Sequence, residues 1–122
     1  MSNIEKPVAM AIIRWLSAAE GGRKAGPPLA KVYMATAFFL TDKEEVDRKQ
    51  RDSPILATTL LSILIQKTSQ INKDEDRALI GFLAPNLARP SLYKGAKILI
   101  TEGPKIVANA VVKELLPSDY SQ

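Results

Sequence analysis

The chain has 122 residues, with a hydrophobic fraction of 46%, a charged fraction of 25% and a formal net charge of +4 at pH 7. This length fits one domain with a substantial core, and this composition is far from that of disordered proteins. Cysteine and histidine are both absent, which excludes disulfides, thiolate nucleophiles, histidine metal ligands and a Ser-His-Asp relay. We therefore expect one folded domain, residues 1–122, with no catalytic residues, no metal site and no cofactor.

The N-terminal stretch 1–16 has an acidic residue in its polar lead and an arginine in its apolar part, and no cleavage site of small residues follows. This pattern is not typical of a secretory signal. The longest uncharged apolar stretch, 54–66, is shorter than the roughly 20 residues that a helix needs to cross a bilayer. We expect a cytoplasmic protein with no membrane partner.

Apolar segments recur at the spacing of short strands and alternate with turn-rich or charged stretches. The segments are 8–16, 31–40, 55–66, 78–84, 96–101 and 105–115. Both alternating faces of 31–40 are apolar, which is typical of a strand in a tightly packed barrel. The pattern predicts an all-β fold, a single small closed barrel of about six antiparallel strands.

The periodicity of apolar residues does not decide between strand and helix for two of these segments. The segment 105–115 also places apolar residues near helical spacing, and 55–66 could be a buried helix. Threonine pairs and isoleucines favour a strand in 55–66, and we favour a strand in 105–115 as well. An α+β fold is the alternative.

Two charged excursions separate the expected strands. In 41–52, Thr41 precedes Glu44 by three residues and acidic residues precede basic ones by four, a pattern that allows a short helical turn in a solvated stretch. In 67–77, the adjacent carboxylates of Asp74, Glu75 and Asp76 lack the spacing of a calcium loop. A polar hairpin connection is favoured there.

The segment 18–28, AAEGGRKAGPP, places two glycines, two basic residues and two prolines after the first expected strand. It has neither the P-loop spacing nor the Rossmann spacing of glycines. Gly21 and Gly22 suit a positive φ, and Pro27 and Pro28 enforce an extended path without amide donors. We interpret the segment as a connection between strands.

Two stretches, one toward each end of the chain, carry a resemblance to a known family. In IIRWLSAAEGGRKAG, residues 12–26, a strand runs into an E-G-G-R loop. In SLYKGAKILITEGPKIVANAVVKEL, residues 91–115, a glycine turn, a strand, an E-G turn and a final strand follow one another. In this order they resemble the C-terminal β-barrel domain of elongation factor Tu and related translation GTPases.

The resemblance implies a six-stranded barrel that binds a macromolecule. In the family this barrel helps to hold aminoacyl-tRNA, and the E-G turn before the last strand lies near the RNA backbone; Glu102 and Gly103 match that turn. Thr101 stands where the family has an arginine, and Pro104 where it has a glycine. These residues include no GTP-binding domain, so the resemblance implies a free-standing barrel that acts by binding a partner itself.

Basic residues on the expected loops, together with the E-G turn, are our candidate partner-binding residues. They are Arg23, Lys24, Arg89, Lys94, Lys97, Glu102, Gly103 and Lys105. A basic surface suits RNA or an acidic protein surface. Apart from Tyr93 and Tyr120, most aromatic residues lie in apolar strands, where packing is their expected role. We expect a non-enzymatic binding module whose loops recognise a protein or RNA partner; a homodimer is also compatible.

Two other classes of function have to be weighed against the composition of the chain. A small domain without catalytic residues also fits an immunity or antitoxin-like protein that neutralises a toxin by covering its surface. An enzyme would need Glu20 and Glu102 to pair in a cleft, which a small barrel with a filled interior rarely offers. We expect no enzymatic activity and no small-molecule substrate.

Overall fold

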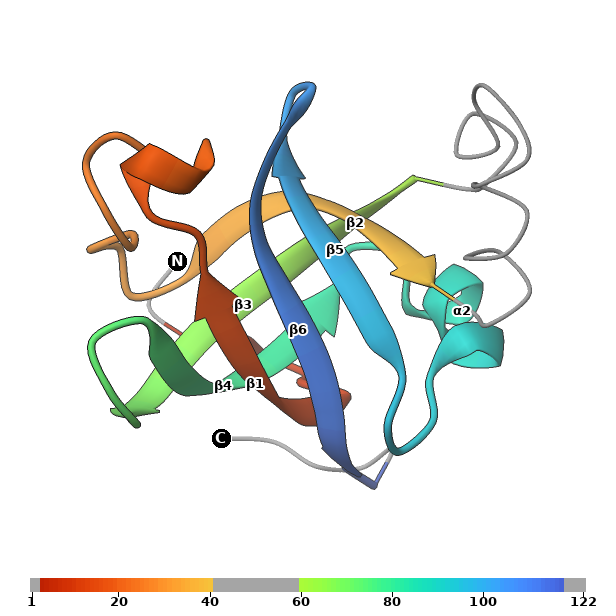
Figure 1. Cartoon of the computed structure of the whole chain (residues 1–122). Helices are drawn as coiled ribbons and strands as arrows, with labels where there is room; N and C mark the ends of the chain where they lie inside the picture. Colours follow the sequence, from red (N-terminus) through yellow and green to blue (C-terminus); the bar gives the residue numbers. More distant parts are fainter. Residues whose placement is uncertain (1–2, 41–59, 118–122) are drawn as a thin grey trace.

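A computed structural model of the chain describes residues 3–40 and 60–117. In this part, antiparallel strands form a closed barrel in the order β1-β4-β3-β2-β5-β6 (Figure 1). The strands are β1 (Ala9–Trp15), β2 (Tyr33–Leu40), β3 (Leu61–Gln70), β4 (Glu75–Phe82), β5 (Lys97–Glu102) and β6 (Lys105–Leu115). The predicted all-β barrel is confirmed, and the segment 105–115 is a strand rather than a helix.

The barrel closes because β6 pairs with β1, in a register that runs from Ala11↔Val112 to Trp15↔Ala108. Every neighbouring pair is antiparallel, so β1, β3 and β5 run in one direction and β2, β4 and β6 in the other. We call the end where β1 stops and β2 starts the loop end; it contains residues 16–32, 71–74 and 103–104. The opposite end, which contains residues 83–96, is the helix end.

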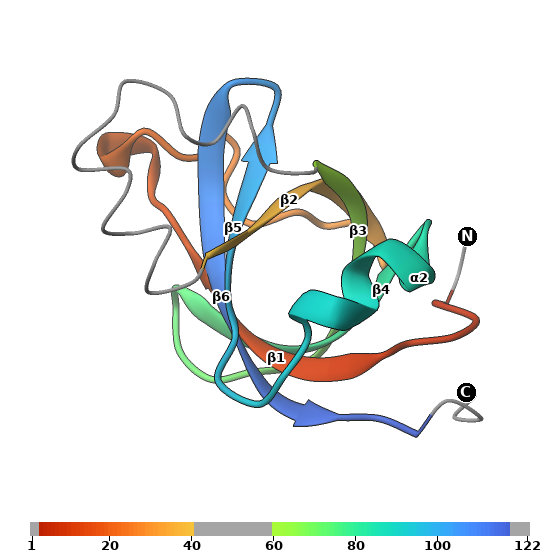
Figure 2. The same ribbon diagram turned by 90° about the vertical axis from the view of Figure 1, so that its right-hand side faces the viewer.

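Short helical elements lie at both ends. The 3-10 helix η1 (Ala18–Glu20) is part of the loop end, and α2 (Pro85–Ala88) with the 3-10 helix η3 (Arg89–Ser91) belongs to the helix end. In Figure 2 the strands form a ring, and α2 lies in front of its opening. Within residues 3–40 and 60–117, no helix is long and apolar enough to cross a membrane.

The barrel interior alternates large and small apolar side chains. Ile13, Ile63, Ile80 and Ile98 are fully buried. Buried alanines lie on the same or on neighbouring strands: Ala9 and Ala11 on β1, Ala37 on β2, Ala78 on β4, and Ala108 and Ala110 on β6. A barrel of few strands has a narrow interior, so isoleucines fit only where neighbouring positions are small. The isoleucines and alanines of the apolar segments therefore determine which face of each strand points inward.

An aromatic pair lies at each end of this core. Trp15 and Tyr33 meet edge to face at the loop end, with ring centroids 5.6 Å apart. Phe39 and Phe82 meet at the helix end, with centroids 5.5 Å apart. Beyond them the fully buried Ala88 anchors α2 to the core. Such pairs add roughly 0.5–1.5 kcal/mol beyond the burial of their area.

The N-terminal residues cover the outer wall of β3 and β4. Ile4 is buried against Leu64 and Leu79, and its backbone N–H donates to Oε1 of Gln66 at 2.9 Å. A Cβ on Gly81 would come within 2.8 Å of the Ile4 side chain. The packing of Ile4 explains why Leu64 on β3 and Leu79 on β4 are buried although they face outward from the barrel.

The boundaries of two predicted segments are corrected. We expected a strand over 55–66 and a charged excursion over 67–77, whereas β3 continues to Gln70 and β4 already begins at Glu75. The ladder extends past the apolar segments as far as Gln70↔Asp76, with a register shift between Lys67 and Ser69, because backbone pairing does not require apolar side chains. Only 71–74 form the connection. The predicted excursion 41–52 lies outside the described residues.

Candidate functional site

The loop end brings together segments that are far apart in the sequence. Because β5 ends there and β6 begins there, the E-G turn lies beside the connection 16–32 that leaves β1. In the hairpin turn, Gly103 has a φ of 60°, in the left-handed region that glycine adopts without strain. The two stretches that carry the family resemblance therefore meet at this end.

An ion pair joins the two segments. Nη1 of Arg23 lies 2.9 Å from Oε2 of Glu102, and the side chains are 24% and 39% exposed. Tyr33 donates its hydroxyl hydrogen to the same carboxylate oxygen, and the Arg23 guanidinium lies 5.4 Å from the centroid of the Tyr33 ring. Nε of Arg23 also donates to the Gly26 carbonyl at 3.0 Å. We call Arg23, Tyr33 and Glu102 the clasp.

The clasp changes the acidity of its tyrosine. Burial raises the pKa of the Tyr33 hydroxyl above its ordinary value of 10.0, and the hydrogen bond to the negatively charged Glu102 raises it further. The opposite effect of the Arg23 charge is smaller. Tyr33 is therefore a neutral hydrogen-bond donor at physiological pH.

A second polar group lies under the clasp. Nε1 of Trp15 donates to Oδ2 of Asp76 at 3.0 Å, and Nζ of Lys67 lies 3.6 Å from Oδ1 of the same carboxylate. Trp15 and Asp76 are both buried. A buried carboxylate needs such partners, because it would otherwise lose its hydration without compensation. The loop end is thus tied to β1, β3 and β4 as well as to β5.

The start of the connection 16–32 is fixed by a capping box around η1. Ser17 Oγ accepts from the Glu20 N–H at 3.2 Å, and Oε1 of Glu20 accepts from the Ser17 N–H at 2.8 Å. Nη2 of Arg14 lies 3.0 Å from Oε2 of Glu20. The backbone hydrogen bond from Ser17 and the Arg14 side chain lower the pKa of Glu20. Glu20 is therefore a structural carboxylate of this turn.

The two glycines of the E-G-G-R sequence have different roles. Gly21 ends η1 with a φ of 95°, as expected. Gly22 does not have a positive φ. It is required instead by a close approach, since a Cβ there would lie 2.2 Å from the Leu16 carbonyl oxygen.

The candidate binding residues fall into two groups. Arg23, Lys24, Glu102, Gly103 and Lys105 lie at the loop end, because they belong to the connection 16–32 and the β5–β6 turn. The others belong to the helix end, on η3 and the approach to β5. They are Arg89, Lys94 and Lys97. They do not form one surface, because β5 extends between the two ends.

At the loop end two glutamates are paired with arginines, whereas two of the candidate binding lysines have no acidic partner among the described residues. Glu20 pairs with Arg14, and Glu102 pairs with Arg23. Lys24 and Lys105 are exposed, and no carboxylate of residues 3–40 or 60–117 pairs with either. The rim therefore presents unpaired positive charge around a neutralised clasp.

Tyr33, Trp15 and Asp76 were not among the predicted site residues. Trp15 and Tyr33 lie in apolar segments, and packing was their expected role. Asp76 was interpreted as part of a polar connection, although it is buried in β4. The only sequence signal for the role of Asp76 was a carboxylate at an inward-facing position close to an expected strand. That signal could be used only if the start of β4 was predicted correctly.

Comparison with models of known protein families gives no match for this chain, and comparison with curated protein sequences gives none either. The resemblance to the C-terminal barrel of elongation factor Tu rests on residues 12–26 and 91–115 and stays a prediction.

Proposed function

We propose that the chain is a non-enzymatic binding module whose loop end docks on an acidic surface of a protein partner. The observation that carries the proposal is the ion pair of Arg23 with Glu102, which neutralises the acid of the E-G turn. Lys24 follows Arg23 directly, and Lys105 is the register partner of Glu102. The pair therefore lies beside two lysines that have no carboxylate partner among the described residues, and such unpaired charge steers association with an acidic surface.

Apolar side chains at the same end support a protein partner. Leu29, in the connection 16–32, is fully exposed at 102%, and Ile106, the second residue of β6, is 41% exposed. Protein interfaces combine desolvated apolar anchors with a charged rim, and a few such anchors supply most of the binding energy. Leu29 and Ile106 are the anchors that we assign to this surface.

RNA is the less favoured partner because stacking surfaces are lacking. Trp15 is only 5% exposed, and Tyr33 is contacted by Trp15 and Arg23. Binding of single-stranded RNA uses aromatic faces on which bases stack, whereas lysine–phosphate contacts alone give affinity without specificity. The described loop end offers lysine–phosphate contacts but no open aromatic face for base stacking.

A photo-crosslinking experiment tests the proposal. Benzoylphenylalanine replaces Leu29 in one variant and Leu83, an exposed leucine of the helix end, in a control. Each variant is irradiated in lysate from the native cells, with and without nuclease. We expect a nuclease-resistant protein adduct from position 29 and none from position 83. An adduct that nuclease removes would indicate RNA, and equal adducts from both positions would contradict docking at the loop end.

A further inference from the structure

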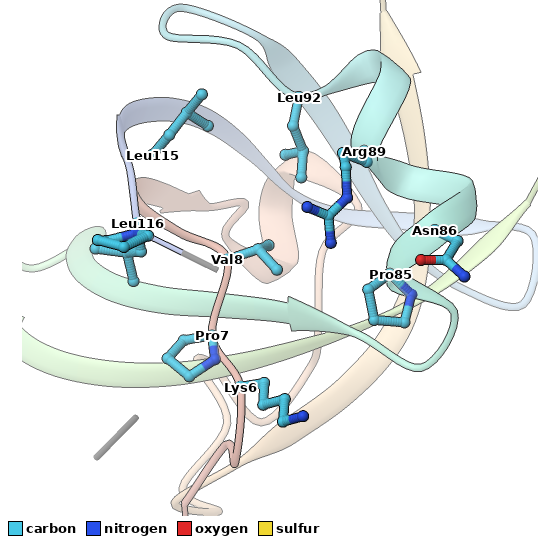
Figure 3. A pocket seen from close by; sticks show the side chains of 10 residues that line it. Lys6, Pro7, Val8, Pro85, Asn86, Arg89, Leu92, Leu115 and Leu116 are labelled. Atoms are coloured by element: carbon cyan, nitrogen blue, oxygen red, sulfur yellow. The ribbon is translucent and has the colours of Figure 1, made fainter. Parts of the chain in front are cut away.

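A pocket of about 330 Å³ lies at the helix end, on the opposite side of the barrel from the clasp. Figure 3 shows the segments that meet around it: residues 6–8 before β1, the start of α2, the η3 region and the residues that follow β6. Pockets that bind small molecules have volumes of roughly 300–1,000 Å³, so this one is at the lower limit of that class.

The walls of the pocket are fixed by backbone hydrogen bonds. The Val8 N–H donates to the Ile80 carbonyl at 2.8 Å, and the Leu116 N–H donates to the Val8 carbonyl at 3.0 Å. The Leu92 N–H donates to the Arg89 carbonyl at 3.1 Å. A ligand would therefore enter a preformed space and would not have to order its walls, which lowers the cost of binding.

Seven of the ten described residues that line the pocket are apolar. Val8, Leu92, Leu115 and Leu116 line the pocket together with three prolines, which contribute no backbone N–H donor. Leu115 is 47% exposed although it is apolar. A ligand that covered these side chains would gain free energy in proportion to the apolar area that it removed from water.

The described part of the lining carries charge of one sign. Among the described residues that line the pocket, Lys6 and Arg89 are charged, Asn86 adds an amide, and none is acidic. Figure 3 shows the Arg89 guanidinium directed between Leu92 and Val8, toward the middle of the labelled side chains. Within the described ranges, no carboxylate pairs with Arg89 or Lys6. A guanidinium beside apolar walls is suited to a carboxylate that carries an apolar body.

From this combination we propose that the helix end binds a small amphipathic carboxylate, with its apolar chain against Val8, Leu92 and Leu116 and its carboxylate on Arg89. At about 30 Å³ for each water-sized group, the pocket holds about ten non-hydrogen atoms. A medium-length fatty acid such as octanoate is of this size. The site is independent of the docking surface at the loop end, and the two proposals fail separately.

The test compares three probes with the same chain: octanoate, octanol and octylammonium. Each is titrated into the ¹⁵N,¹³C-methyl-labelled protein and followed by NMR. We expect octanoate to shift the methyl signals of Leu92 and Leu116, with binding about two- to fivefold tighter than that of octanol, because octanol lacks the charged contact with the exposed Arg89 side chain. Octylammonium should bind more weakly than octanol, because Lys6 and Arg89 repel its charge.

Two variants separate the site from general surface effects. Arg89→Gln should reduce the affinity for octanoate toward that for octanol, with Lys6 retaining part of the attraction, whereas Lys94→Gln removes the same charge from an exposed lysine outside the pocket and should have no effect. Backbone amide spectra verify that both variants fold. Equal affinities for the three probes, or an equal loss in both variants, would overturn the proposal.

Discussion

Arg23 and Glu102 are 79 positions apart in the sequence, yet their side chains form an ion pair of 2.9 Å that joins the connection after β1 to the β5–β6 turn. Both also contact Tyr33, so the pair fixes three segments of the loop end at once. The proposed docking surface depends on this arrangement, because Lys24 and Lys105 are each next to a member of the clasp.

The first prediction concerns the strength of the clasp. In a double-mutant cycle with Arg23→Met and Glu102→Gln, we expect a coupling free energy of about 1 kcal/mol, because the pair is partly exposed. Each single variant should lower the melting temperature by about 4 °C. Urea denaturation of the four proteins measures the coupling, and additive effects of the two substitutions would contradict the pair.

The second prediction is a dependence of stability on alkaline pH. Since the pKa of Tyr33 is raised in the folded protein, its contribution to stability is fully present below pH 10.0, the ordinary tyrosine value, and is lost as pH rises through the raised pKa. Tyr33→Phe should remove this part of the alkaline loss of stability. Absorbance titration at the phenolate band should show one tyrosine fewer in the late phase of the variant than in the parent chain.

The third prediction separates the two adjacent glycines. Gly22→Ala should destabilise the protein by about 2–4 kcal/mol, because the new Cβ would collide with the Leu16 carbonyl oxygen, and the Leu16 N–H is itself bonded to the Val107 carbonyl. Gly21→Ala meets no atom within 4 Å and should cost about 1 kcal/mol for its positive φ. Comparison of their free energies of unfolding checks the order; equal costs would show that Gly22 is not held against Leu16.

The fourth prediction concerns acid. The pKa of Glu20 lies below its ordinary value of 4.5, so the stability that its carboxylate contributes is present above pH 4.5 and is lost as pH falls through the lowered pKa. The parent chain should be more stable than Glu20→Gln at neutral pH, and this difference should shrink in acid. Thermal melts of both proteins between pH 7 and pH 2 measure it. A difference that stays constant over this range would contradict the role of Glu20 in the capping box.

The sequence predicts the barrel because each strand carries a local signal. Each strand lies in or overlaps a short apolar segment, and turn-rich or charged stretches mark the connections. The end of β3 and the start of β4 escaped prediction, since Lys67 to Gln70 and Glu75 to Arg77 are all polar but still pair in the ladder. Boundaries that are predicted from apolar residues alone mark the extent of the core. In this barrel the strands extend beyond the core.

The candidate site was predictable only in part. Arg23 and Glu102 were both selected, but their direct contact depends on a closed barrel and on the register of β5. Arg89 was selected as a basic residue of one binding surface, whereas it lies at the opposite end, in a pocket formed by three separate segments. Neither a long-range pairing nor a pocket of this kind leaves a periodic signal in the sequence.

Docking through the loop end is tested most directly by the affinity of the crosslinked partner, once it is isolated, for charge-reversed variants of the chain. Lys24→Glu with Lys105→Glu should weaken binding at least about tenfold and make it less sensitive to salt, because two attractive contacts with acidic residues are reversed. Lys94→Glu with Lys113→Glu makes the same change in net charge at the helix end and should leave the affinity unchanged. Equal affinities of the two double variants would contradict docking through the loop end.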